Sequence, residues 1–350
     1  MNKQTIAILF GGQSSEHEVS CVSATTIISN IDKDKYLMLF VGITKEGHWV
    51  KADSLEDIVS GNWRNSSIPA ILSPDATQKG FLITEKENTS LFKVDVIFPV
   101  LHGMYGEDGT VQGLIELSKI PYVGCGVLAS AVSMDKFYTK IIVDTLHIRQ
   151  AKYVPVLSHQ LHHMEAVLSR IEDTLSYPVF VKPSNAGSSQ GVSKASTPDE
   201  LKDALSLAAK HDKKILVEET IVGREIECAV LGSQDPKASG VGEILAAADF
   251  YDYDAKYNNA ESKTVISPNL PEGITDEIRK YALEIFNAVD GFGLSRVDFF
   301  LEKGTNQVVF NEINTLPGFT AISMYPMLWE EKGLSKAELI ERLIQMSFRR

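Results

Sequence analysis

The sequence predicts an α/β unit at the N-terminus followed by two α+β units. Its 350 residues are enough for two or three domains, since a domain usually holds about 100–200 residues. Residues 5–10 form a short apolar run that ends in two glycines and leads into a helical spacing of apolar residues, a pattern typical of strand, loop and helix. Later apolar runs are joined by glycine-rich turns, as in hairpins.

The first 125 residues have the pattern of a doubly wound α/β domain. Apolar runs at 5–10, 37–43 and 94–101 predict strands, and the last is apolar on both faces, as a central parallel strand should be. Residues 19–31 predict a helix, and Ser15 with Glu18 predicts a capping box at its start.

Residues 45–92 are more polar and contain scattered Gly, Ser, Asn and Pro. This composition predicts an insertion with shorter strands. It contains no motif that indicates a function.

We predict a second domain at 126–216 and a third at 217–350. The second has a helix from Asp135, a strand, glycine loop and strand around 179–194, and a further helix at 198–211. The third has strand patterns near 226–231, 296–301 and 308–313.

Composition argues against two classes of partner. Hydrophobic residues make up 44% and charged residues 23% of the chain, as in soluble globular proteins. The net charge is −12, which would repel nucleic acid and anionic membrane surfaces. We therefore expect neither as a partner.

The cysteines and the N-terminus predict a cytoplasmic protein. Cys21, Cys125 and Cys228 are an odd number and lie far apart, so they favour buried thiols in a reducing compartment. The apolar run at 6–10 is too short for a signal peptide or a membrane span.

The strongest chemical signal is a pair of strands near the C-terminus. A turn centred on Thr305 places Asp298 opposite Glu312 and Arg296 opposite Asn314, with all four on one face. Two carboxylates and an amide form an all-oxygen site that suits Mg²⁺. A surface hairpin with solvated acids is the alternative interpretation.

Two lysines predict a phosphate site. Lys182 ends an apolar strand before the glycine and serine loop at 185–191, and Lys136 stands at a helix start. Backbone amides of such a loop and a fixed ammonium group can hold phosphate. A plain turn is the alternative for the loop.

Two further segments carry candidate residues. His102 ends a buried strand, where open α/β sheets place ligand-binding residues. The segment 251–257 is dense in tyrosine and aspartate and includes Lys256, which suits a loop that closes over a site.

A nicotinamide-dependent oxidoreductase is an alternative from another class. Gly124, Gly126 and Ala129 match G-x-G-x-x-A, with Asp144 about twenty residues on. However, a dinucleotide fingerprint belongs in the first strand-to-helix turn of its domain, and this run follows a complete α/β unit.

Six motifs together resemble those of the D-alanine:D-alanine ligases of the ATP-grasp superfamily, in collinear order from residue 5 to about 340. They are GGQSSEHEVS at 11–20, HGMYGEDG at 102–109, MDK at 134–136, VKP at 181–183 with GSS at 187–189, YDYDAKY at 251–257 and NEINTLPGFT at 311–320.

The resemblance implies a three-domain ATP-grasp enzyme with an N-terminal pre-ATP-grasp domain. Such an enzyme joins two D-alanines through an acyl phosphate for peptidoglycan synthesis, using ATP and two Mg²⁺ or Mn²⁺. It also implies a cytoplasmic homodimer. A ligase that takes D-serine as second substrate stays open, although Lys256 and Tyr257 favour the D-alanine type.

The resemblance further implies roles for individual residues. Catalytic positions would be Glu16, Ser188, Tyr257, Arg296 and Gly318. Substrate-binding positions would be His102, Lys256, Ser323 and Met324. ATP-binding positions would be Lys136, Lys182, Ser189, Glu218, Glu219, Ile221 and Glu225. Metal ligands would be Asp298, Glu312 and Asn314.

Overall fold

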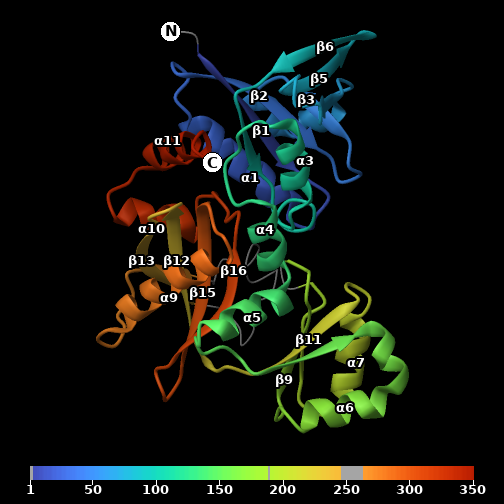
Figure 1. Ribbon diagram of the computed structural model, residues 1–350, viewed down its shortest axis with the longest axis vertical. Coiled ribbons are helices and arrows are strands. Elements are labelled where there is room, and N and C mark those ends of the chain that lie inside the picture. The colour runs from blue at the N-terminus through green and yellow to red at the C-terminus, as the bar shows by residue number, and fades with distance from the viewer. Residues whose placement is uncertain (1–2, 188–189, 246–262) are drawn as a thin grey trace.

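The computed structural model describes residues 3–187, 190–245 and 263–350, which form three units with helices packed on their sheets (Figure 1). The described residues contain four sheets. This arrangement confirms the predicted combination of one α/β unit with two α+β units.

The N-terminal unit is built on a sheet in the order β3-β2-β1-β7. Its strands are β1 (Gln4–Gly11), β2 (Tyr36–Ile43), β3 (Trp49–Ala52) and β7 (Val96–Val100). β1 is parallel to both β2 and β7. Because side chains alternate along a strand, Ile6 and Ile8 of β1 pack in one core and Ala7 and Leu9 in another.

Helices cover both faces of this sheet. One core contains residues of α1 (His17–Asn30) and of α11 (Lys336–Ser347), although α11 comes from the far end of the chain. The other contains residues of α3 (Thr110–Ser118). Burial on both faces explains why the strands of this sheet are almost continuously apolar.

The 45–92 segment forms short elements, as predicted. They are β3, α2 (Leu55–Ser60), a 3₁₀ helix (Asn62–Asn65), and the antiparallel strands β4 (Ala70–Leu72), β5 (Gly80–Glu85) and β6 (Asn88–Lys93). Residues of β4 and β5 join the core that contains α3.

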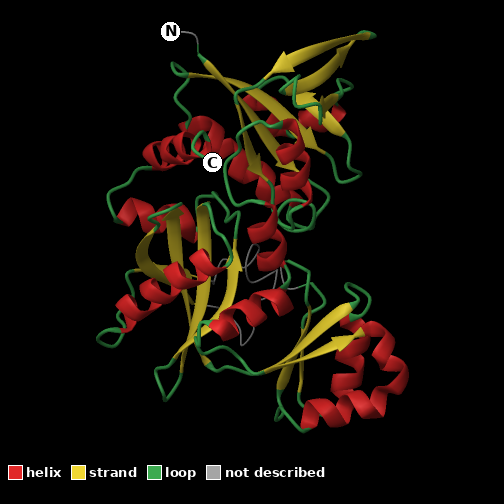
Figure 2. Ribbon diagram, viewed as in Figure 1, coloured by secondary structure: helices red, strands yellow, loops and turns green. Residues whose placement is uncertain are grey.

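The central unit has an antiparallel sheet in the order β10-β9-β11-β8. Its elements are β8 (Tyr153–Leu157), a 3₁₀ helix (Ser158–His163), α6 (Met164–Glu172), β9 (Val179–Pro183), β10 (Ser193–Ala195), α7 (Pro198–Ala208) and β11 (Lys214–Glu219). Helices α6 and α7 lie on one side of the sheet (Figure 2) and share its core. The other side is thus available to a ligand.

The C-terminal unit has an antiparallel sheet in the order β14-β13-β12-β15-β16. The strands are β12 (Gly223–Gly232), β13 (Lys237–Leu245), β14 (Lys263–Ile266), β15 (Gly293–Glu302) and β16 (Val308–Asn314). The helices α4 (Val127–Met134), α5 (Lys136–Thr145) and α9 (Ile274–Ala288) pack into one core with it. The helix α10 (Met324–Glu331) packs in the core that also contains α1 and α11, so the first and third units share hydrophobic packing.

The predicted capping box is wrong. Helix α1 has Glu16 at its N-cap, with no side-chain cap. Ser14 rather than Ser15 accepts a hydrogen bond from the Glu16 amide, at 3.2 Å, and donates to the carbonyl of His102, at 2.6 Å. The loop before α1 is therefore held by a contact with the distant residue His102, and not by the local capping box that the sequence predicted.

Two other predictions concern burial and membranes. The three cysteines are free and buried, as predicted. Within the described ranges, no helix is both long enough and apolar enough to cross a membrane.

Candidate active site

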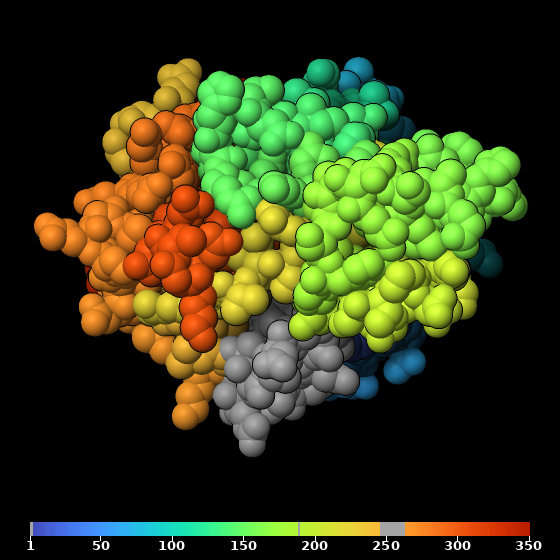
Figure 3. Space-filling model, turned by 90° about the horizontal axis from the view of Figure 1, so that it is seen from below, coloured from blue at the N-terminus to red at the C-terminus, as the bar shows by residue number. Residues whose placement is uncertain are grey.

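A cavity of about 1160 Å³ is lined by residues of all three units. Seen from below, the molecule shows a furrow between the central and C-terminal units, with the chain just after β11 at its base (Figure 3). Every predicted site residue that the structure describes lines the cavity: Glu16, His102, Lys136, Lys182, Glu218, Glu219, Ile221, Glu225, Arg296, Asp298, Glu312, Asn314, Gly318, Ser323 and Met324. Ser188, Ser189, Lys256 and Tyr257 lie outside the described residues.

Strands β15 and β16 place four polar side chains on the cavity wall: Arg296, Asp298, Glu312 and Asn314. Arg296 donates two hydrogen bonds to the carboxylate of Asp298, at 2.8 and 2.7 Å, and Asn314 Nδ2 donates to the same carboxylate at 3.0 Å. Burial acts to lower the pKa of Arg296, but Asp298 and Glu227 raise it well above its usual value. Arg296 is therefore a fixed positive charge in the cavity.

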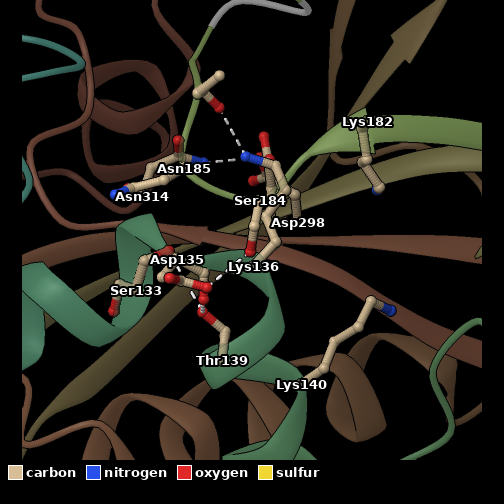
Figure 4. A network of polar contacts seen from close by, with 12 residues as sticks. Ser133, Asp135, Lys136, Thr139, Lys140, Lys182, Ser184, Asn185, Asp298 and Asn314 are labelled. Carbon is tan, nitrogen blue, oxygen red and sulfur yellow. Dashed lines mark hydrogen bonds and ion pairs between the residues drawn. The ribbon is translucent and has the colours of Figure 1, made fainter. Parts of the chain in front are cut away.

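Lys136 joins the start of α5 to the glycine loop after β9. Its Nζ donates to the carbonyl of Ala186 at 2.8 Å and lies 3.9 Å from a carboxylate oxygen of Glu312. The adjacent Asp135 caps α5 and accepts a hydrogen bond from the hydroxyl of Ser184 at 2.6 Å (Figure 4). The helix start and the loop are thus held together where phosphate was predicted to bind.

Lys182 is paired with a buried acid of β11. Glu218 forms ion pairs with Lys182 and, at 2.8 Å, with Lys140 of α5. Burial acts to raise the pKa of Glu218, but the two ammonium groups lower it below its usual value. Glu218 therefore stays ionised inside the cavity wall.

Glu16 lies against two backbone segments that contain glycine. A Cβ atom at Gly103 would lie 3.1 Å from Glu16 Oε2, and one at Gly187 would lie 3.0 Å from the same atom. A methyl group at either position would require the Glu16 carboxylate to shift by a few tenths of an ångström. Glu16, at the start of α1, therefore lies next to the glycine loop of the central unit.

The loop after β7 contributes two titratable groups, the buried His102 and the partly buried Glu107. His102 Nδ1 lies 2.9 Å from the carbonyl of Leu316, and burial lowers the pKa of the ring. Glu107 accepts from the amide of Gly103 at 2.8 Å. Burial, and then the neighbouring Glu16, raise the pKa of Glu107 to about 8.

The chain after β16 carries three further predicted positions. Ser323 Oγ accepts a hydrogen bond from the amide of Thr320 at 2.9 Å. A Cβ atom at Gly318 would lie 2.8 Å from Ser323 Oγ. Met324 begins α10 and packs against Gly242 of β13.

The donor set on β15 and β16 fits a magnesium ion. Asp298, Glu312 and Asn314 offer oxygen atoms, which Mg²⁺ prefers. Asn314 turns its Nδ2 to Asp298, so its Oδ1 is the atom left for a cation. The nearby positive groups are Arg296 and Lys136.

The glycine turn at 124–129, which the oxidoreductase alternative would use to bind a dinucleotide, is in contact with Arg350. Arg350 donates to the carbonyl of Gly124 at 3.0 Å, and a Cβ atom at Gly126 would lie 3.1 Å from the Arg350 guanidinium. Neither glycine lines the main cavity. The geometry thus gives the oxidoreductase alternative no support.

Two residues that hold site residues in position, Lys140 and Ser23, were not predicted from the sequence. Lys140 stands one helical turn after Lys136, a spacing that places both on one face of a helix. Ser23 lies on α1 and contacts His102. Its partners come from distant parts of the chain, so no local pattern could identify it.

Two antiparallel α+β units with a cavity between them, lined by lysines of β9 and α5 and by the acidic hairpin of β15 and β16, define an enzyme of the ATP-grasp class. Family models described as D-ala D-ala ligase N-terminus and D-ala D-ala ligase C-terminus match residues 5–125 and 142–345. The chain belongs to the D-alanine–D-alanine ligase family.

Relatives and solved structures agree with this assignment. A D-alanine–D-alanine ligase of Acetivibrio thermocellus is 53% identical, covering 100% of this chain and 97% of the relative. One from Ruminiclostridium cellulolyticum is 51% identical, covering 100% and 96%. The VanG D-Ala:D-Ser ligase from Enterococcus faecalis has a TM-score of 0.90 at 39% identity, covering 99% and 100%. The D-alanine–D-alanine ligase from Coxiella burnetii has a TM-score of 0.88 at 35% identity, covering 100% and 95%.

Proposed function

We propose that the protein joins two D-alanine molecules to D-alanyl-D-alanine, with conversion of ATP to ADP and phosphate. The observation that carries the proposal is that one cavity contains Lys136, Lys182 and the acidic hairpin together with Glu16, Arg296 and Gly318. Full-length relatives that are named D-alanine–D-alanine ligases support it.

The chemistry has two steps, because a carboxylate is a poor electrophile. An oxygen of the first D-alanine's carboxylate attacks the γ-phosphorus of ATP, and ADP leaves. The amine of the second D-alanine then attacks the carbonyl of the acyl phosphate, loses a proton, and displaces phosphate. No protein nucleophile is needed, so catalysis rests on positioning and charge.

The lysines and acids suit the ATP end of the cavity. Lys136 and Lys182 would bind the phosphates, while Glu218, Glu219, Ile221 and Glu225 would surround the adenine and ribose. Ser189 of the glycine loop would join the phosphate contacts. Lys136 now lies near Glu312, and Lys182 is paired with Glu218. Phosphate groups of ATP would take the place of these carboxylates, so the positive charges of both lysines would stay neutralised.

Asp298, Glu312 and Asn314 would hold Mg²⁺ or Mn²⁺, with two ions per site. When bound, the ions supply positive charge that neutralises the phosphate oxygens. The hairpin would also orient Arg296, because Arg296 donates two hydrogen bonds to Asp298.

The opposite end of the cavity suits the amino acids. Glu16 would accept the ammonium group of the first D-alanine, close to His102, and Ser188 and Tyr257 would connect Glu16 to the glycine loop and a closing loop. Arg296 and the Gly318 amide would stabilise the tetrahedral oxyanion. Lys256, Ser323 and Met324 would surround the second D-alanine.

Incubation with ATP, Mg²⁺ and D-alanine tests the proposal. We expect ADP and D-alanyl-D-alanine in equal amounts, and neither product when L-alanine replaces D-alanine. Absence of the dipeptide in the presence of all three components would refute the proposal.

A ligase that uses D-serine as second substrate is the other candidate, because the E. faecalis D-Ala:D-Ser ligase has a TM-score of 0.90 with this chain. D-alanine and D-serine offered together at limiting ATP decide between the two. We expect D-alanyl-D-alanine to predominate; a majority of D-alanyl-D-serine would favour the alternative.

Four broader expectations accompany this function. We propose a cytoplasmic homodimer in peptidoglycan synthesis, with domains at 1–125, 126–216 and 217–350. Light scattering with size-exclusion chromatography would give twice the 38.6 kDa chain mass for a dimer. A value equal to the chain mass would contradict the dimer.

A further inference from the structure

The N-terminal unit holds the chain that follows β16, at residues 316–319. The amide of Leu316 donates to Glu107 Oε1 at 3.2 Å, and its carbonyl lies 2.9 Å from His102 Nδ1. Glu107 Oε2 accepts from the amide of Gly103 at 2.8 Å. One carboxylate therefore bridges the N-terminal and C-terminal units.

The ring of His102 is engaged at its second nitrogen as well. Nε2 lies 3.3 Å from the hydroxyl of Ser23, which accepts a hydrogen bond from the amide of Phe319 at 3.1 Å. A carbonyl can only accept, so Nδ1 carries the ring proton toward Leu316, and Nε2 accepts from Ser23. Burial lowers the pKa of His102, which favours this neutral form.

These contacts leave one backbone amide of the segment available. Pro317 has no N–H group, and the amides of Leu316 and Phe319 are bound to Glu107 and Ser23. Among the described residues, the Gly318 amide has no hydrogen-bond partner, and Gly318 lines the cavity. The clamped neighbours on both sides therefore fix the position of this donor.

We propose that Ser23, His102 and Glu107 form a clamp that sets the Gly318 amide for the oxyanion, so that His102 is a positioning residue rather than a ligand of the first D-alanine. The inference rests on the proposed function, because the oxyanion belongs to that reaction. A direct contact between His102 and substrate would break one of its two existing bonds.

The clamp matters because the amide and its supports belong to different units. Ser23 is fully buried on α1, whereas Gly318 follows the C-terminal sheet. An oxyanion donor acts only within a narrow distance range, and a displacement of about 1 Å can reduce the rate about 100-fold. Removal of a clamp residue should therefore lower kcat without removing a substrate contact.

Three variants test the clamp: Ser23→Ala, His102→Asn and the double variant. We expect each single change to lower kcat by about 10- to 100-fold with a small change in KM for D-alanine. Because both residues act through one chain of hydrogen bonds, the double variant should be no slower than the slower single variant.

Ser118→Ala is the matched control. Ser118 is also fully buried in the N-terminal unit and also accepts a backbone amide, that of Ile120 at 3.3 Å. It lies on α3 and does not line the cavity. Ser118→Ala should lower the thermal midpoint about as much as Ser23→Ala while kcat stays unchanged.

Two kinetic outcomes would contradict the clamp. One is a double variant whose loss in kcat is the product of the two single losses. The other is a raised KM for D-alanine with unchanged kcat in His102→Asn.

Amide hydrogen exchange provides a readout that does not need turnover. If the unaltered protein forms no dipeptide, the proposed function has failed, and exchange alone decides the clamp. Faster exchange at Phe319 in Ser23→Ala than in Ser118→Ala supports it, and equal exchange contradicts it.

Discussion

Asp298 lies opposite Glu312 on neighbouring antiparallel strands, directly after a shift in their register. Nearer the turn, Phe299 pairs with Phe310, so Asn311 is the extra residue of a β-bulge. The bulge changes the residue that faces Asp298 from Asn311 to Glu312. Two carboxylates and Asn314 are thereby brought together at the cavity wall.

Glu312→Gln should abolish most of the activity while the fold stays intact. The change keeps the shape of the side chain but removes the charge that would hold the cation. Mutation of a residue that only hydrogen-bonds to a metal ligand lowers metal affinity or activity about 10- to 100-fold. Because Glu312 would be a ligand itself, we expect kcat to fall about 100-fold or more. The measurement is kcat as a function of Mg²⁺ concentration.

The matched control is Glu284→Gln, since Glu284 lies on α9 with its side chain 41% exposed and is 3.8 Å from Lys280. It should have normal kcat and normal Mg²⁺ dependence. A Glu312→Gln enzyme that behaves like this control would contradict the magnesium assignment.

Lys140→Met should destabilise the protein and weaken ATP binding. Lys140 and Glu218 form a buried ion pair at 2.8 Å, with side chains 3% and 7% exposed. Loss of one partner of an isolated buried pair costs about 3–5 kcal/mol. Glu218 would keep its ion pair with Lys182, so we expect a smaller loss of about 1–3 kcal/mol. Urea unfolding measures the change in stability, and KM for ATP should rise.

Lys280→Met is the comparison for that change, because Lys280 pairs with Glu284 on the surface, with side chains 69% and 41% exposed. Its loss should cost less than about 1 kcal/mol. Equal destabilisation in both variants would show that the Lys140–Glu218 pair has no special role in stability.

Glu107 should make the protein less stable as the pH rises. Burial, and then Glu16, raise the pKa of Glu107 from 4.5 to about 8 in the folded state. The folded state therefore binds a proton more tightly than the unfolded state, and the stability from this group is full below pH 4.5 and lost as pH rises through about 8.

Glu107→Gln removes the titration, so the thermal midpoint of the variant should fall less between pH 5 and pH 8 than that of the unaltered protein. Parallel pH curves for the two proteins would show that the pKa of Glu107 is not raised.

Gly187→Ala should disturb the first D-alanine site. The added Cβ atom would lie 3.0 Å from Glu16 Oε2, so the carboxylate or the glycine loop must move. We expect a raised KM for D-alanine and little change in the thermal midpoint. Gly113→Ala is the control, because nothing lies within 4 Å of its Cβ position on α3; a kinetic effect as large as that of Gly187→Ala would contradict our interpretation.

The sequence predicted strands at 5–10, 37–43 and 94–101 from their apolar runs, and each coincides with a strand of the N-terminal sheet. The order of the strands within each sheet was not predicted. It predicted the pairing of Asp298 with Glu312 through a turn centred on Thr305. The structure has the turn between Gly304 and Thr305, and the bulge at Asn311 restores the predicted pairing. The pairing was therefore correct although the turn was not.

Contacts across the fold were beyond sequence reasoning. Ser14 orders the loop before α1 because it binds the carbonyl of His102, and Ser23 joins the site through His102 and Phe319. Such partners are far apart in sequence and share no local pattern. The family motifs located the cavity residues, but the hydrogen bonds that position them required the folded chain.

The most direct test of the account follows the oxygen atoms of D-alanine labelled with ¹⁸O in its carboxylate. If the carboxylate attacks ATP and phosphate later leaves the acyl carbon, one labelled oxygen must leave with the phosphate. Mass spectrometry of the released phosphate should therefore show one ¹⁸O atom per dipeptide formed. Unlabelled phosphate alongside D-alanyl-D-alanine would contradict the acyl-phosphate mechanism.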